Sequence, residues 1–308
     1  MDKEAIDLEL DEYLISRYDG VLPLLPYGLR ERLRSVSSAD RKRTEEIRLR
    51  LGHAPSIVMP DGEISIGGEV VARRDLDGVL DLVTRVSAHT VQSSMAQGFV
   101  TARGGYRVGL CGTIVLSDGV MTGYRTISSV AVRISRGIVG AADNVIKEIA
   151  PDGKICSTLI ISPPGVGKTT LLRDVVRCIS DTGTRVAIAD ERGEIAALCD
   201  GVPQMDVGTH TDVLDACPKA HGVMLLLRAM NPEVIAVDEI TAPEDITAAL
   251  GAANCGVKLL ATAHANGLPD LKLRALYRGL FEAGVFEKAV IISKKSGKRQ
   301  YDCVNLEI

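Results

Sequence analysis

The feature that most constrains the fold of this chain is the stretch 157–172, which reads STLIISPPGVGKTTLL. An apolar, β-prone run at 159–161 enters a loop rich in proline and glycine, and the loop leads to Lys168 and Thr169. A helical pattern follows and runs to about residue 179. The order of strand, glycine loop, Lys-Thr pair and helix is what a phosphate-binding loop requires. The stretch therefore predicts a strand, a phosphate-binding loop and a helix in direct succession.

Each part of this loop has an expected role. Backbone N–H groups of residues 165–169 can converge on phosphate oxygens, and the helix N-terminus adds a favourable dipole. We expect Lys168 to reach the β- and γ-phosphates and the Thr169 hydroxyl to bind Mg²⁺. The loop departs from the usual pattern at Ser162, where the first glycine is expected. The predicted nucleotide-binding residues of the loop are Pro164, Gly165, Val166, Gly167, Lys168, Thr169 and Thr170.

Three further apolar runs, 186–189, 234–237 and 259–261, end in polar residues that can bind ligands or take part in catalysis. The run 234–237 leads into Asp238 and Glu239, which we expect to hold Mg²⁺ and to act as the general base on water, respectively. The run 259–261 leads into Thr262 and His264, and we expect His264 to sense the γ-phosphate. Ligands of open parallel sheets sit beyond the carboxyl ends of the strands, so these clusters are expected to line one crevice.

The run 186–189 leads into an acidic box that reads DERGE at 190–194. Within this box we take Glu191 as a candidate catalytic residue and Arg192 as a candidate nucleotide contact. The box also fits a solvated surface loop, and Glu194 could serve only the dipole of a following helix.

The pattern of the chain changes near its middle. Residues 1–137 predict an α+β domain, residues 138–153 a linker, and residues 154–308 an α/β domain with a mostly parallel sheet covered by helices on both faces. The predicted strands are 45–51, 56–59, 63–66, 99–102, 106–110, 130–134, 159–161, 185–189, 234–237 and 258–261. Outside the charged and helical first 43 residues, the predicted helices are 75–86, 141–149, 168–179, 212–230 and 243–255.

Composition excludes several classes of protein. The 36 basic and 40 acidic residues give a net charge of −4, and the chain has no Trp, 3 Phe and 7 Tyr, so a surface that stacks nucleic-acid bases is not expected. No run approaches the length of about 18 apolar residues that crosses a membrane, and the first residues lack the apolar core of a signal peptide. The 7 cysteines form no C-x-x-C pair, which favours reduced thiols and a cytoplasmic location.

With these motifs in place, the chain resembles the type II/type IV secretion ATPase superfamily of RecA-like motors, and within it the family of stage III sporulation protein AA. The resemblance covers about residues 20–305. It depends on the phosphate-binding loop and on six further segments: EIRLRLG at 46–52, GGYRVGLCG at 104–112, ISSVAVRI at 127–134, DERGEI at 190–195, MNPEVIAVDE at 230–239 and TAHA at 262–265.

The resemblance implies a RecA-like ATPase domain that uses ATP and Mg²⁺, preceded by a smaller α+β domain. It implies a hexameric ring in the mother-cell cytoplasm, recruited peripherally by the membrane proteins of a sporulation channel complex that it would energise. In such motors, arginines of the N-terminal domain and linker complete the nucleotide site. The matching candidates here are Arg107, Arg133 and Arg136, with Arg192 in the acidic box.

Two other readings of the sequence stay open. The protein could be a nucleotide-gated assembly module that binds ATP with negligible turnover, which Ser162 would allow. It could also be a RecA-like motor that moves DNA, although the acidic charge balance and the scarcity of aromatic residues oppose this. A kinase is less favoured, because no site for an acceptor substrate is evident.

Overall fold

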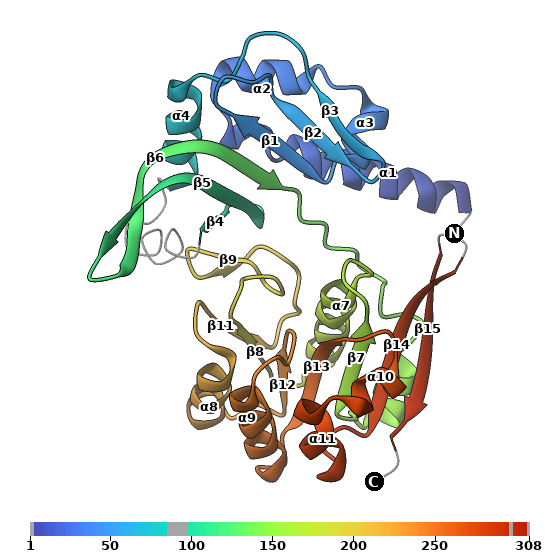
Figure 1. The fold of residues 1–308 in the computed structure, drawn as a ribbon. Coiled ribbons are helices and arrows are strands. Elements are labelled where there is room, and N and C mark those ends of the chain that lie inside the picture. Colours follow the sequence, from blue (N-terminus) through green and yellow to red (C-terminus); the bar gives the residue numbers. More distant parts are fainter. Residues whose placement is uncertain (1–2, 85–97, 296–297, 307–308) are drawn as a thin grey trace. The chain divides into compact units, whose positions relative to one another are not determined.

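The computed structural model describes residues 3–84, 98–295 and 298–306. The chain forms two compact units. The first unit comprises Met1–Arg136 together with Cys199–Gln204, and the second comprises Gly137–Leu198 and Met205–Ile308 (Figure 1). Within the described residues, no helix has the length and apolar character needed to cross a membrane.

The first unit is built on an antiparallel sheet of six strands in the order β3-β2-β1-β6-β5-β4. Its strands are β1 (Glu46–Arg50), β2 (Ser56–Met59), β3 (Gly62–Ser65), β4 (Phe99–Ala102), β5 (Tyr106–Ser117) and β6 (Val120–Arg133). Its helices are α1 (Lys3–Asp19), η1 (Leu22–Leu24), α2 (Tyr27–Arg34), α3 (Ser38–Arg43) and α4 (Arg73–Thr84). The pair β9 (Leu198–Cys199) and β10 (Val202–Pro203) forms a separate two-stranded sheet.

Alternation of apolar and charged residues explains the central strand of this sheet. Ile47 and Leu49 are fully buried in the core, whereas the residues between them are partly exposed, as a half-buried strand requires. Helix α4 packs on the same core through Leu76, Val79 and Val83. The predicted strand and helix are confirmed, although residues 85–86 of the predicted helix lie outside the described residues.

The hairpin of β5 and β6 is much longer than predicted. The sequence predicted strands at 106–110 and 130–134, whereas the structure pairs the two strands from Arg107 and Arg133 to Ser117 and Val120. Residues of the outer half, such as Leu116 and Val120, are exposed. The outer half therefore lacks the apolar alternation that marks a strand with one buried face.

The second unit is an α/β unit whose sheet has the strand order β11-β8-β12-β13-β7-β14-β15. All neighbouring strands are parallel except the edge pair β14 and β15. The strands are β7 (Thr158–Ser162), β8 (Val186–Asp190), β11 (Thr211–Asp215), β12 (Val234–Val237), β13 (Lys258–His264), β14 (Lys288–Lys295) and β15 (Lys298–Asn305). The helices are α6 (Ile146–Ile149), η2 (Pro151–Gly153), α7 (Lys168–Ser180), α8 (Lys219–Ala229), α9 (Pro243–Asn254), α10 (Leu268–Leu273) and α11 (Ala275–Glu282).

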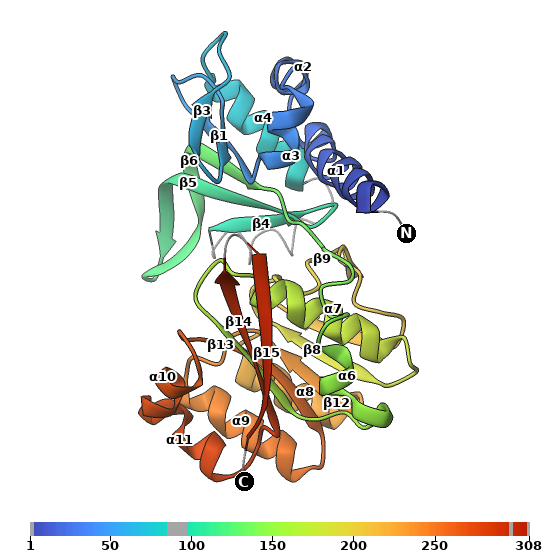
Figure 2. The same ribbon diagram turned by 90° about the vertical axis from the view of Figure 1, so that its right-hand side faces the viewer.

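Successive residues of the central strands face two separate cores. Ile160 packs beneath α7, whereas its neighbours Leu159 and Ile161 pack beneath α8, α9 and α11 (Figure 2). Because both faces of the sheet are covered, the strands appear in the sequence as continuous apolar runs. The predicted mostly parallel sheet with helices on both faces is confirmed.

Two predicted helices are wrong in part. The segment 212–230 was expected to be helical throughout, but its first residues form β11, and α8 begins only at Lys219. The predicted helix 141–149 is reduced to α6, and its preceding turns bury Ala142 and Val145 in the core beneath α7. In the segment 212–230 tertiary packing decides the conformation, because short apolar stretches fit a strand or a helix equally well.

The loop that precedes β11 passes very close to α7. A Cβ atom on Gly208 would lie 2.5 Å from the Cβ of Ser180 and 2.9 Å from the carbonyl oxygen of Arg177, and the φ of Gly208 is +84°. Gly183 has a similar φ of +94°, but a Cβ there would have no neighbour within 4 Å. A side chain at position 208 would therefore clash with α7, whereas a side chain at position 183 would not clash with any neighbour.

We expect G208A to lower the free energy of unfolding more than G183A. Both variants place alanine in the left-handed region, which costs about 1–2 kcal/mol. G208A adds overpacking against α7, which costs about 1–3 kcal/mol more. Denaturant titration of the two variants measures the difference, and equal losses would contradict the close approach.

Candidate functional site

The loop between β7 and α7 has the backbone conformation of an anion-binding loop. β7 ends at Ser162, one residue beyond the predicted strand 159–161, and α7 begins at Lys168, as predicted. Gly165 and Gly167 adopt φ values of +72° and +113°, which residues with a Cβ rarely adopt. Gly167 is the N-cap of α7, so the free N–H groups of the first helical turn, including that of Thr170, lie directly after the loop.

Ser162 fits the loop without distortion of the strand. Its side chain is fully buried, and its hydroxyl donates a hydrogen bond to the carbonyl oxygen of Pro163 at 2.9 Å. The hydroxyl is thereby satisfied inside the protein. Pro164 and Gly165 are exposed at the outer turn of the loop, and Val166 packs at the edge of the core beneath α7.

A carboxylate ties the start of α7 to the ends of two strands. Asp238 accepts a hydrogen bond from the Thr169 hydroxyl at 2.9 Å and another from the Thr262 hydroxyl at 2.6 Å. Thr262 in turn accepts a hydrogen bond from the backbone N–H of Glu239 at 2.9 Å. The predicted partners from the loop and from the run 234–237 are therefore brought together by the fold.

The Thr169 and Asp238 oxygens fit Mg²⁺. Hydroxyl and carboxylate oxygens are the hard ligands that this ion prefers, and it commonly takes only one or two protein ligands besides phosphate and water. Among the described residues there is no cluster of three or more His, Cys, Asp or Glu that could enclose a metal on its own. Thr169 and Asp238 are thus suited to hold Mg²⁺ together with a phosphate.

Lys168, His264 and Glu239 form a chain of contacts. The Lys168 ammonium donates to Nδ1 of His264 at 2.8 Å, and Nε2 of His264 lies 2.9 Å from Oε1 of Glu239. The tautomer with its proton on Nε2 satisfies both contacts, because Nδ1 then accepts and Nε2 donates. The imidazole thus connects the cation of the loop to the carboxylate beyond β12.

Burial and nearby carboxylates act on Lys168 in opposite directions. Lys168 is buried, and this burial lowers the pKa of its ammonium, while Asp238, Glu239 and Glu194 raise it. A buried cation interacts with a bound anion through a lower effective dielectric than a surface cation does. The position therefore favours a strong interaction with phosphate.

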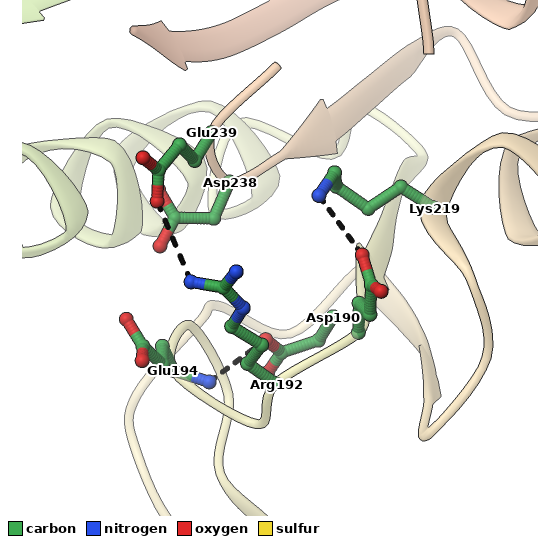
Figure 3. A pocket seen from close by; sticks show the side chains of 7 residues that line it. Asp190, Arg192, Glu194, Lys219, Asp238 and Glu239 are labelled. Carbon is green, nitrogen blue, oxygen red and sulfur yellow. Dashed lines mark hydrogen bonds and ion pairs between the residues drawn. The ribbon is translucent and has the colours of Figure 1, made fainter. Parts of the chain in front are cut away.

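Glu239 occupies a special backbone position and has a cationic neighbour besides His264. Its φ is +51°, a left-handed conformation that is uncommon for residues other than glycine. Its carboxylate also lies 3.6 Å from the guanidinium of Arg192, as Figure 3 shows. A concave region lined by Asp190, Glu191, Arg192, Glu194, Lys219, Asp238 and Glu239 surrounds this pair.

The acidic box is a rigid loop clamped from two sides. Asp190 is almost fully buried, and its carboxylate accepts hydrogen bonds from the backbone N–H groups of Glu194, Ile195 and Ala196 at 2.8–3.2 Å. Burial raises the pKa of Asp190, and these N–H donors oppose that effect. Asp190 therefore shapes the loop and does not point a free carboxylate at a ligand.

The second side of the clamp is Arg173 on α7. The buried Arg173 guanidinium donates to the carbonyl oxygens of Glu194 and Ile195. Helix α7 is thus fixed to the acidic box. The alternative of a solvated surface loop does not describe Asp190, because its side chain is buried.

Glu191 is held by a buried lysine that sequence reasoning missed. The ammonium of Lys219, at the first position of α8, lies 2.9 Å from Oε2 of Glu191 (Figure 3). It also lies 3.8 Å from Asp245 at the start of α9. The predicted catalytic candidate Glu191 is therefore paired with a cation, and the side chain of Lys219 is only 9% exposed. A basic residue at the first position of a helix gave no signal of this role.

The arginines expected from the N-terminal domain all lie in the first unit. Arg107 stacks on the ring of Phe99, with its guanidinium carbon 3.7 Å from the ring centroid. Arg133 is exposed at the end of β6. Arg136 donates to the carbonyl oxygens of Lys42 and Thr44, which fixes the segment between α3 and β1. Arg136 thus has a structural contact that its sequence position did not predict.

We expect R173A to destabilise the second unit and loosen the acidic box. Removal of the guanidinium leaves buried carbonyl oxygens without a donor, which costs about 1–3 kcal/mol for each group. Denaturation and hydrogen exchange at Ile195 and Ala196 measure the effect. R185A is the control, because Arg185 also donates to a carbonyl oxygen but is exposed. Equal stability of the two variants would contradict the clamp.

Solved structures share this fold. The X-ray structure of the Legionella pneumophila ATPase DotB matches with a TM-score of 0.61 at 18% identity, covering 92% of this chain and 81% of that chain. The crystal structure of the pilus retraction motor PilT with bound ADP matches with a TM-score of 0.58 at 17% identity, covering 86% and 80%. The likeness shows that this chain has the α/β fold of the secretion ATPase structures.

The sequence itself matches a defined family. The family model described as "Sporulation stage III, protein AA" matches residues 16–303. "Stage III sporulation protein AA" of Bacillus subtilis (strain 168) is 35% identical over 283 residues, which cover 90% of this chain and 91% of the relative. The resemblance expected from the motifs is confirmed, and this chain belongs to the family of sporulation stage III protein AA.

Proposed function

We propose that this protein is a Mg²⁺-dependent ATPase that converts ATP and water to ADP and phosphate. The observation that carries the proposal is the chain of contacts from Lys168 through His264 to Glu239, at 2.8 and 2.9 Å, beside the Thr169–Asp238 pair. Phosphoryl transfer to water needs a cation for phosphate, oxygen ligands for the metal and a carboxylate for the water. The structural relatives include an ATPase and a motor with bound ADP, which supports the same reaction.

Binding of the triphosphate would use the loop and the start of α7. Backbone N–H groups of the loop donate to phosphate oxygens, and the buried Lys168 neutralises developing charge on the transferred group. Thr169 and Asp238 would hold Mg²⁺, which supplies further charge neutralisation when bound. These contacts position the γ-phosphate for attack.

Glu239 would orient the attacking water and accept its proton. Its carboxylate is fixed by Nε2 of His264 and lies close to Arg192. His264 would lose its contact with Lys168 when the lysine moves to the γ-phosphate. The contact between the imidazole and Glu239 would then depend on whether phosphate is bound. Glu191 and the acidic box would pass this change on to domain movement.

The biological role that we propose follows from the family. The ATPase would energise a channel complex between mother cell and forespore, as a hexameric ring in the mother-cell cytoplasm recruited by membrane proteins. Arg107, Arg133 and Arg136 remain candidates to complete a nucleotide site in such an assembly. The name of the Bacillus subtilis relative supports the role in sporulation.

The first test separates binding from hydrolysis. K168A removes the cation of the loop and is expected to abolish nucleotide binding. E239Q keeps the shape of the side chain without the base, and we expect ATP binding to persist while turnover falls by roughly 10²–10⁴-fold. Phosphate release and equilibrium binding of ATP measure the two quantities.

The matched control is E233Q, which makes the same chemical change at an exposed residue directly before β12, at the end of that strand opposite to Glu239. Wild-type turnover that neither K168A nor E239Q reduces would refute the proposal. Stoichiometric ATP binding without turnover would favour the nucleotide-gated assembly module.

The second test concerns His264. H264A breaks the connection between Lys168 and Glu239, and misplacement of the base is expected to lower kcat by roughly 10²-fold. ATP affinity should stay close to that of the wild type, because the loop contacts remain. H210A, a change of another histidine near the opposite end of the strands, is the control. A loss of affinity with unchanged kcat would contradict the role of His264.

A further inference from the structure

The edge hairpin of β14 and β15 reaches past the end of the strand that leads into the phosphate loop. β14 pairs in parallel with β7 from Lys288 and Thr158 to Ile291 and Ile161. β7 ends one residue later, whereas β14 continues to Lys295, so the far part of the hairpin lies alongside the loop (Figure 1). The hairpin thus brings C-terminal residues to the phosphate loop.

Arg299 on β15 lies directly against this loop. A Cβ atom on Gly167 would be 3.0 Å from the guanidinium carbon of Arg299 and 3.1 Å from its Nη2. The guanidinium therefore packs closely on the glycine that precedes Lys168, and a Cβ atom at this position would crowd it. Arg299 is exposed, and among the described residues no carboxylate forms an ion pair with it.

Strand register explains why Arg299 faces the loop. Residues of one face alternate along β15, so Arg299 shares its face with Tyr301 and Cys303. Tyr301 and Cys303 pack against the core beneath α7, which begins at the end of the loop. Arg299 consequently points to the side of the sheet that carries α7.

Two cations near the loop besides Lys168 are already paired with carboxylates. Asp238, Glu239, Glu191 and Glu194 place carboxylates near the site. Lys219 is paired with Glu191, and Arg192 lies beside Glu239, so these two cations are engaged with carboxylates. A bound phosphate chain adds several negative charges, and a guanidinium can donate two parallel hydrogen bonds to phosphate oxygens.

We propose that Arg299 binds the phosphates of a nucleotide seated in the loop between β7 and α7. The inference rests on the proposed nucleotide binding, and it assigns a phosphate contact to an arginine of the same unit. The resemblance to secretion ATPases indicates Arg107, Arg133, Arg136 and Arg192 for this task, and it does not indicate Arg299.

The experiment measures the dissociation constants of ADP and of inorganic tripolyphosphate by calorimetry. R299A is expected to raise both constants by roughly tenfold or more, as for the loss of a hydrogen bond to a charged group. R299K keeps the positive charge but not the two parallel N–H donors of the guanidinium, and it is expected to recover part of the lost affinity. K295A is the control, because it removes a charge from the same hairpin on the opposite face and should leave both constants near those of the wild type.

Each outcome has a distinct meaning. Wild-type affinities in R299A, or an equal loss in K295A, would overturn the role of Arg299 and leave the proposed ATPase intact. A loss for ADP with unchanged tripolyphosphate binding would place Arg299 on the nucleoside and overturn a phosphate contact. Absence of ADP binding by the wild type would refute the proposed function together with this inference. Thermal unfolding of R299A should match that of the wild type, because the side chain is exposed.

Discussion

The arrangement of the site depends on one carboxylate that joins three elements. Asp238 follows β12 and accepts hydrogen bonds from Thr169 on α7 and Thr262 on β13. Thr262 also fixes the backbone of Glu239. Hydrogen bonds to an ionised acceptor are stronger than those between neutral groups. The start of α7, Thr262 and the backbone of Glu239 are therefore joined through a single shared carboxylate.

Parallel pairing makes this convergence possible. Val237 lies opposite Ala261 in β13 and Ala189 in β8, so the polar residues that follow these strands emerge at one edge of the sheet. The chain continues from the strand ends into α7, the acidic box and the turn before α9. These segments therefore lie at the same edge of the sheet. A shift of one residue in any pair would turn the side chains of that strand to the opposite face.

Local patterns were sufficient for the parts of the molecule that consist of one continuous segment. The phosphate loop, the apolar strands and the strand-end residues 238, 239 and 264 could all be predicted, because each is marked by its own neighbours in sequence. β11 could not, because its five residues fit a helix as well as a strand and only pairing with β8 decides between them.

Single charged residues with distant partners were also beyond prediction. Arg173 and Lys219 act on residues 21–28 positions away, and Arg299 meets a loop from the far end of the chain. Each is a single charged residue that belongs to no repeating sequence pattern. From the sequence alone, such a residue is equally consistent with a solvent-exposed side chain. Their roles follow only from the register of the strands and the packing of α7 and α8.

The backbone of Glu239 carries a consequence for the evolution of this site. Its left-handed conformation costs a residue with a Cβ about 1–3 kcal/mol, a cost that glycine would not have. Selection for stability alone would thus favour glycine over glutamate at position 239, and the carboxylate would be lost. Where variants of this chain keep glutamate at position 239, the function of its carboxylate outweighs the cost of the left-handed backbone.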